Sequence, residues 1–499
     1  MPDPHLVLCG GLPAARAPRA WRAADRLALD IGPGDAVHLP LDRLAARART
    51  GLSDVSADLL AVAAYVFAAD QAVTRGGTAG VDYGDAWRRR FRLEVPVRRP
   101  DVWARPAVHA ALADALRVLT DDEYEFGFHP DPDPAPLPAY LYDAVAPGRP
   151  EFDEVVLFSG GLDSLGGAVD EVLVRRRRVV LVSHRAATRV GARQDALFAA
   201  LAARVRPRDP TPAHLGVVVN KRRGLNRDFT QRTRSLVFAA AGAAVARLVG
   251  LWRVRFYENG VTSLNHPVSP ELVGARASRT THPAALDRLG ALLSAVYDAP
   301  FGVDNPYQGA TKAELCGWLK GWGHADLCAL TCSCGSVWGK AEAAPHCGRC
   351  SQCVDRRVAV LAAGLAGADD PPDRYESDPL AGERDGAALT YAERYVGSAR
   401  EAAAVGSPRA FAVRFPEVYD AAPHLGPSVA AGVAAAHDLY RRHAAGVERG
   451  LRAGMAARMV GLSWDRPPAR SLLGLVFNEP IPLPPPAAAP PAAPPDPPP

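Results

Sequence analysis

The sequence predicts an α/β protein whose central domain is a doubly wound parallel sheet, with an N-terminal α+β domain before it and a helical extension after it. Short apolar runs of the kind buried on both faces of a parallel sheet occur at Val155–Phe158, Val179–Val182, Leu215–Val219 and Val254–Tyr257. Segments with helical patterning separate them, at Leu165–Val174, Ala192–Val205 and Arg234–Val249. Strands that alternate with helices in this way are typical of a doubly wound sheet.

The first domain is predicted to cover residues 1–128. It contains an apolar helix at Ala57–Val73, for which Ser56 is the expected N-cap, and an alternating strand at Phe91–Val95. A second helix is expected at Pro106–Leu119. These elements predict an α+β unit.

Proline-rich stretches mark the other boundaries, because proline continues neither a helix nor a central strand. The predicted parts that follow the first domain are a linker at 129–150, a central domain at 151–366, a helical C-terminal extension at 386–477 and a tail at 478–499. The tail is almost entirely Pro and Ala, so we expect it to be disordered and partly polyproline II.

The composition is that of an ordinary globular protein, with 48% hydrophobic and 22% charged residues among 499. No apolar run approaches the roughly 20 residues that a membrane span needs, so we expect no membrane association. The sequence shows no secretion signal, which makes the cytoplasm the expected location. A net charge of +4 is too small to indicate direct nucleic-acid binding.

A phosphate-binding loop is predicted directly after the first central strand. It consists of Ser159, Gly160, Gly161, Leu162, Asp163 and Ser164. A Gly pair lets the backbone turn tightly and present its N–H groups to an anion, and the helix that follows contributes its positive N-terminal end. The flanking hydroxyls add donors. The alternative is a plain glycine turn, and no Gly-Lys-Ser/Thr string of the other common nucleotide loop follows.

A metal site is predicted in the loop at 334–353. Four cysteines provide thiolates there, the last three at CxxCxxC spacing: Cys334, Cys347, Cys350 and Cys353. Four thiolates satisfy tetrahedral Zn²⁺ with no position left for water, which indicates a structural role. Buried free cysteines and an iron–sulfur cluster are the alternatives, and Cys332 is close enough to replace the first ligand. The remaining cysteines, Cys9, Cys316 and Cys328, are expected in the core.

The two motifs together carry a family resemblance. The phosphate loop resembles that of the PP-loop superfamily, whose fold is adenine nucleotide alpha hydrolase-like. With Thr331–Cys334 and Cys347–Arg356 added, the region Val155–Leu365 resembles 7-cyano-7-deazaguanine synthase, the nitrile-forming enzyme of the queuosine pathway. The resemblance implies a carbon–nitrogen ligase that uses ATP, Mg²⁺ and Zn²⁺. Such an enzyme adenylates the carboxylate of 7-carboxy-7-deazaguanine and passes it to ammonia.

The resemblance also implies site residues. Lys312, in Thr311-Lys312-Ala313-Glu314, and Arg234, in Arg234-Ser235, would act with Asp163 of the loop by neutralising phosphate charge. His184 follows the second strand, where the family binds the nucleotide, although the family's Tyr-Gly-Gln is replaced there by Ser-His-Arg. A solvated surface lysine is the alternative for Lys312, and a solvated basic face is the alternative for Arg234.

The chain departs from the synthases after the fourth strand. The family's Asp-containing segment ending in Tyr-Pro-Asp-Cys is absent from Glu258–Pro267 and Arg276–Pro283, so Glu258, Asn259 or Asn265 would have to read a purine-like edge. With its added domains the chain is more similar to enlarged paralogues in bacterial defence, such as the synthase-like component of the Qat anti-phage system. The N-terminal likeness lies in Trp87–Val97, Trp103 and Leu119–Phe128. It implies a protein partner, encoded in the same defence operon, that receives a deazaguanine.

Three other readings stay open. A housekeeping synthase would make the free nitrile with ammonia. A non-catalytic nucleotide-binding scaffold would use the Pro-rich tail as a linker or ligand. A tRNA-thiolating enzyme would use its cysteines catalytically, although the CxxCxxC spacing favours a closed metal site.

Overall fold

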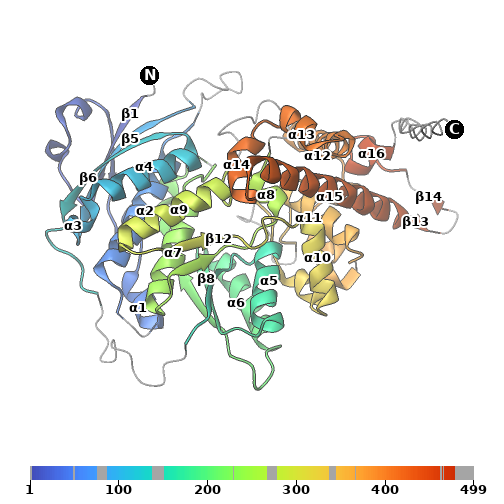
Figure 1. The fold of residues 1–499 in the computed structure, drawn as a ribbon, viewed down its shortest axis with the longest axis horizontal. Helices are drawn as coiled ribbons and strands as arrows, with labels where there is room; N and C mark the ends of the chain where they lie inside the picture. The colour runs from blue at the N-terminus through green and yellow to red at the C-terminus, as the bar shows by residue number, and fades with distance from the viewer. Residues whose placement is uncertain are drawn as a thin grey trace, which may run out of the picture.

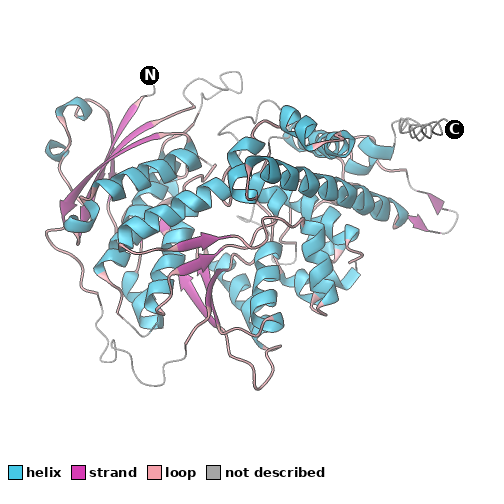
Figure 2. Cartoon of the chain, in the orientation of Figure 1, coloured by secondary structure: helices cyan, strands magenta, loops and turns pink. Residues whose placement is uncertain are grey.

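The computed structural model describes residues 3–48, 51–75, 87–137, 151–228, 230–266, 278–335, 344–365, 367–460, 463–464 and 466–477. The chain is an α/β protein with two parallel sheets, drawn in magenta in Figure 2. The expected tail at 478–499 and most of the expected linker, at 138–150, lie outside the described residues.

The central sheet has five strands in the order β12-β11-β7-β8-β9, and every pairing is parallel. The strands are β7 (Glu154–Leu157), β8 (Val179–His184), β9 (Ala213–Val217), β11 (Arg253–Arg255) and β12 (Gly302–Asp304). The chain runs outward from β7 to β9, crosses back through α7 (Arg234–Leu248) and continues outward through β11 and β12. The order of winding therefore reverses between β7 and β11, as in a doubly wound sheet.

The N-terminal sheet corrects one expectation. Its strands β2 (Asp25–Leu29), β1 (Pro4–Cys9), β5 (Arg90–Val97) and β6 (Glu123–Pro130) are all parallel, so this part is α/β and not α+β. The physical reason lies in the connections: α4 (Pro106–Thr120) is the crossover between the parallel neighbours β5 and β6, and α2 (Asp54–Ala72) lies in the long connection that carries the chain from β2 past β1 to β5.

The start of α2 corrects a second expectation. Ser53 caps this helix in place of Ser56, because the Ser53 hydroxyl accepts a hydrogen bond from the Ser56 N–H at 3.2 Å. Among the described residues, α2 is also the one helix long and apolar enough to cross a membrane by length and composition, and 89% of its most apolar window is buried inside the protein.

One hydrophobic core joins the N-terminal part to the central sheet. In it α2 packs against α7, and α4 packs against α9 (Pro283–Tyr297). The helices α5 (Leu162–Val169), which continues as a π-helical turn to Val174, and α6 (Thr188–Ala202) pack on the other side of the sheet with α10 (Lys312–Gly321). The remaining short elements are α1 (Leu41–Ala48), α3 (Pro100–Trp103), α8 (Gly260–Leu264), β3 (Val37–His38) and β10 (Asn220–Lys221).

The C-terminal helices form a second core around the long helix α15 (Val429–Ala456). The others are α12 (Gly386–Ala404), α13 (Pro408–Arg414), α14 (Val418–Leu425) and α16 (Leu472–Phe477), with a short antiparallel pair β13–β14 (Met459–Val460 and Ser463–Trp464). Helix α15 packs along α11 (Ser351–Ala362). In Figure 1 the N-terminal part, in blue, and these helices, in orange and red, lie on either side of the central sheet.

Candidate functional site

The Ser159–Ser164 loop leaves the carboxyl end of β7 and enters α5 at Leu162, at the position where the winding of the sheet reverses. Gly160 has φ +85°, a left-handed conformation that favours glycine. The Ser159 hydroxyl donates to the Ser164 hydroxyl at 3.1 Å and accepts from the Gly161 N–H at 3.3 Å. Parallel sheets of this kind bind ligands at such a reversal point, beside the carboxyl ends of the strands.

Two residues that precede the cysteine cluster hold this loop. The Cys332 N–H donates to the Gly160 carbonyl at 3.0 Å, and the Leu162 N–H donates to the Ser333 hydroxyl at 3.4 Å. The two motifs that are far apart in the sequence therefore lie side by side in the fold.

Lys312 is the first residue of α10, whose capping box is formed by Thr311 and Glu314. Its Nζ lies 3.1 Å from Asp163 Oδ2 and 3.2 Å from Asp355 Oδ2, and the residue is 2% exposed. Burial alone would lower the pKa of Lys312, but the carboxylates of Asp163, Asp355 and Glu258 raise it above its ordinary value. The lysine is therefore charged at neutral pH.

Glu258 and Asn259 reach the loop from the carboxyl end of β11. The Asn259 side-chain amide donates to Asp163 Oδ1 at 3.0 Å and to Glu258 Oε1 at 3.2 Å. Burial, and then the nearby Asp163 carboxylate, raises the pKa of Glu258 well above its usual range. The site thus holds a charged lysine, the Asp163 carboxylate and a glutamate that favours its protonated form.

Arg234 and His184 both contact the ring of Phe238. His184 Nε2 is 2.8 Å from the Val219 carbonyl, and its ring lies 5.6 Å from that of Phe238, over which the Arg234 guanidinium sits at 4.9 Å. Burial lowers the pKa of His184 to about 4, so the ring is neutral. Gln194 joins this group to the loop through the Ser159 carbonyl, at 3.1 Å.

The four predicted cysteines converge. The Sγ atoms of Cys334, Cys347, Cys350 and Cys353 all lie within 4.8 Å of one another. Individual Sγ–Sγ distances are 3.4, 3.9 and 4.0 Å, and a tetrahedral site with Zn–S bonds of about 2.3 Å requires roughly 3.8 Å between sulfurs. The cluster could hold a metal such as zinc.

The other cysteines lie outside this cluster. The Cys332 sulfur contacts Arg193 Nη1 at 3.5 Å and the Pro345 carbonyl at 3.7 Å. Cys9, Cys316 and Cys328 are fully buried, which confirms their predicted place in the core.

The cluster fixes α11 and with it Asp355. Cys350 is the N-cap of α11, and Arg356 in its first turns is fully buried. The Arg356 guanidinium donates to Asp370 Oδ1 at 2.9 Å and to the Cys328 carbonyl at 2.8 Å. Arg356 therefore ties α11 to Cys328 and Asp370, while its neighbour Asp355 contacts Lys312.

The C-terminal helices brace the same centre. Arg442 of α15 donates to both carboxylate oxygens of Glu314, each at 2.6 Å, and so supports the capping box next to Lys312. The Tyr395 hydroxyl of α12 donates to Asp355 Oδ1 at 3.4 Å. The C-terminal helices thus contact two of the residues that surround Lys312, Glu314 and Asp355.

No family model matches the chain, and no curated protein matches it. The fold brings Asp163, Lys312 and the loop together, and it places Arg234 near His184. Asp355 and Ser333 were not predicted, although both belong to the motif strings around the cysteines. Glu258 and Asn259 were considered only as readers of a purine edge, and their contact with Asp163 required the fold.

Proposed function

We propose that this protein is an ATP-dependent ligase that adenylates a carboxylate on a 7-deazaguanine-type substrate and transfers it to a partner protein in bacterial anti-phage defence. The observation that supports this most is the contact between Lys312 and Asp163, 3.1 Å apart beside the Ser159–Ser164 loop. A buried ammonium next to a glycine loop at the reversal point of a parallel sheet suits a nucleotide's phosphates.

The residues fit the groups that this reaction needs. Backbone N–H groups of the loop and the N-terminus of α5 would hold the phosphates of ATP, with the hydroxyls of Ser159 and Ser164 as further donors. Asp163 would hold Mg²⁺, because this ion prefers carboxylate oxygen and bound phosphate. The four cysteines would hold Zn²⁺ in a structural role.

In the first step, a carboxylate oxygen of the substrate attacks the α-phosphorus of ATP, and pyrophosphate leaves. Lys312 stabilises the negative charge that develops on the phosphate oxygens. In the second step, an amine attacks the activated carbonyl, AMP leaves, and the amine loses a proton. His184 and Arg234 are proposed to line the part of the site that binds the nucleotide.

The identities of the acceptor and the substrate are inferred from the family resemblance. The altered segment after β11 is where the chain departs from the substrate-binding segment of the synthases, and its residues 267–277 lie outside the described part of the chain. The amine would belong to a protein encoded in the same operon, and the reaction would take place in the cytoplasm.

Purified protein with ATP, 7-carboxy-7-deazaguanine and the neighbouring operon protein tests this proposal. We expect release of AMP and an increase in the partner's mass, measured by intact-protein mass spectrometry. An unchanged partner mass would overturn protein modification, and free nitrile formed only with ammonia would favour the housekeeping synthase. Full defence by Asp163→Ala and Ser164→Ala variants would favour a scaffold.

A second candidate, sulfur transfer to RNA, is favoured by one observation. Cys332 lies outside the metal cluster, and its backbone contacts the phosphate loop. Amide formation needs no thiol there, so Cys332→Ser should still modify the partner. A Cys332→Ser protein that releases AMP yet leaves the partner unmodified would favour sulfur transfer.

A further inference from the structure

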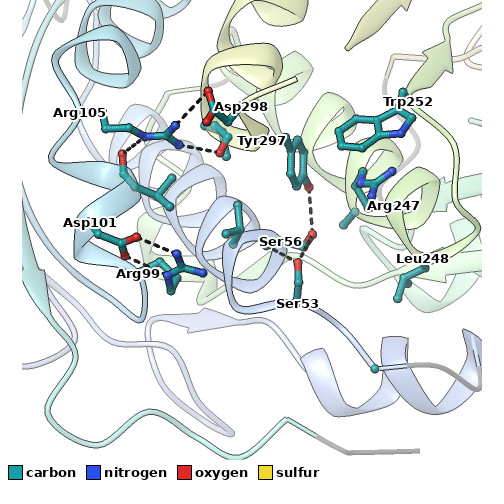
Figure 3. Close-up of a pocket in the computed structure, with 15 residues that line it drawn as sticks. Ser53, Ser56, Arg99, Asp101, Arg105, Arg247, Leu248, Trp252, Tyr297 and Asp298 are labelled. Atoms are coloured by element: carbon teal, nitrogen blue, oxygen red, sulfur yellow. Dashed lines mark hydrogen bonds and ion pairs between the residues drawn. The ribbon is translucent and has the colours of Figure 1, made fainter. Parts of the chain in front are cut away.

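A cavity lies away from the phosphate loop, between the N-terminal part and the central sheet. Its volume is about 480 Å³, and Figure 3 shows its lining side chains. The N-terminal ends of α2 and α4 and the C-terminal ends of α7 and α9 surround it. Trp252, which precedes β11, also lines it, so the cavity faces the amino ends of the central strands. The phosphate loop lies at their carboxyl ends, at the opposite edge of the sheet.

Three arginines from three elements reach this cavity. Arg99 is paired with Asp101, at 2.9 and 2.7 Å, and Arg105 is paired with Asp298, at 3.6 Å. No carboxylate pairs with the third, Arg247, within the described part of the chain, where its guanidinium contacts the Leu251 carbonyl at 3.2 Å. The lining therefore carries one positive charge more than its carboxylates balance.

An aromatic and hydroxyl wall stands beside that charge. The Arg247 guanidinium lies 3.4 Å from the centroid of the Trp252 ring, and this tryptophan is 39% exposed. Figure 3 shows the Tyr297 hydroxyl pointing toward Ser56, and the two oxygens are 3.0 Å apart. Ser56 lies in the first turn of α2, a helix of 19 residues whose N-terminal end is positive.

We propose that this cavity is a second ligand site, which binds a nucleoside phosphate. Arg247 and the N-terminal end of α2 would receive the phosphate, and Trp252 would contact the planar base. The volume lies within the range of cavities that hold small ligands. The site is independent of the proposed reaction, since none of its residues contacts the phosphate loop.

AMP is the probe for a direct test by isothermal titration calorimetry. The titrated protein carries Asp163→Ala and Ser164→Ala, which weaken binding at the phosphate loop, and the cavity variants then show whether the remaining AMP binding belongs to the second site. We expect one AMP per chain, with weaker binding of adenosine and of inorganic phosphate, because each offers only one half of the ligand.

Adding Arg247→Gln should weaken AMP binding by tenfold or more, and Trp252→Leu should weaken it independently through loss of the ring. The matched control is Arg452→Gln, which removes an exposed arginine of α15 and should leave binding unchanged. The proposal is overturned if the protein with the altered loop binds no AMP, or if both cavity variants bind it as tightly as their parent. Neither result would bear on adenylation at the loop.

Discussion

The carboxylate of Asp355 lies 3.2 Å from the ammonium nitrogen of Lys312, and Asp355 is the second residue after Cys353 of the cysteine cluster. Because the same nitrogen is 3.1 Å from Asp163, one lysine joins the helix that follows the cysteine cluster to the phosphate loop. This relationship gives the cysteine cluster a physical role at a distance: it fixes the helix that orients the lysine.

Replacing Asp355 with Asn should therefore lower the rate of AMP release more than it lowers ATP binding. The neutral amide keeps the shape but loses the charge that holds Lys312, and a displaced catalytic group can reduce kcat by about 10-fold to 100-fold. Steady-state kinetics would measure kcat and the KM for ATP separately. The control Asp373→Asn, at an exposed position, should leave both unchanged. Equal kcat values for the wild type and Asp355→Asn would contradict this role.

The cysteine assignments can be separated by metal content. We expect one zinc per chain in the wild type and in Cys332→Ser, because the Cys332 sulfur lies outside the cluster. Cys334→Ser and Cys350→Ser should lose the metal, since each removes one of four ligands. Elemental analysis by mass spectrometry gives the ratio of zinc to protein for each variant. Loss of metal in Cys332→Ser with retention in Cys334→Ser would show that the ligand set is wrong.

The C-terminal extension should contribute to the site through Arg442 and Glu314. A double-mutant cycle with Arg442→Ala and Glu314→Ala, followed by denaturant unfolding, should give a coupling energy of roughly 1 kcal/mol. Each single variant should also lower the rate of AMP release, because the capping box next to Lys312 is weakened. Arg452→Ala, which breaks an exposed ion pair on the same helix, is the control. Additive effects would argue against the coupling.

His266 should make the protein acid-sensitive. It is 6% exposed among the rings of Phe415 and Tyr440, and both of its ring nitrogens lack a hydrogen-bond partner within the described residues. Burial lowers its pKa to about 4, so the unfolded chain, with a pKa near 6.5, takes up the proton first as the pH falls. The stability that neutral His266 contributes to the folded protein is therefore complete above pH 6.5.

As the pH falls from 6.5 to about 4, protonation of His266 in the unfolded chain should lower the free energy of unfolding by roughly 3 kcal/mol. His266→Phe should remove this loss and keep or raise the stability at pH 7. Urea unfolding at several pH values measures the free energy of unfolding for both proteins. The same decline with acid in the wild type and in His266→Phe would contradict the assignment.

Local patterns predicted the central strands and the helices between them, because β-branched runs and a glycine pair after a strand are properties of neighbouring residues. The relative direction of the strands was harder to predict. The pattern of β5 is the same for a parallel or an antiparallel neighbour, so the parallel N-terminal sheet could not be read from it. The three residues of β12 were too few to give a pattern.

The site shows the same limit. The cysteine spacing predicted the cluster, but it left Cys332 and Cys334 as alternatives until the sulfur positions separated them. The motif strings predicted Asp163 and Lys312 individually, whereas their contact with Asp355 depends on how α10 and α11 pack. The start of α7 likewise places Arg234 near His184, a contact that no motif string predicted.

Pyrophosphate exchange tests the central claim most directly. Labelled pyrophosphate should enter ATP only when protein, ATP, Mg²⁺ and 7-carboxy-7-deazaguanine are all present, because only a reversible adenylation step exchanges it. Lys312→Ala should reduce the exchange rate by about 100-fold or more, since it removes the buried charge that we propose stabilises the phosphates. No exchange in the complete mixture, or equal exchange by the wild type and Lys312→Ala, would contradict the account.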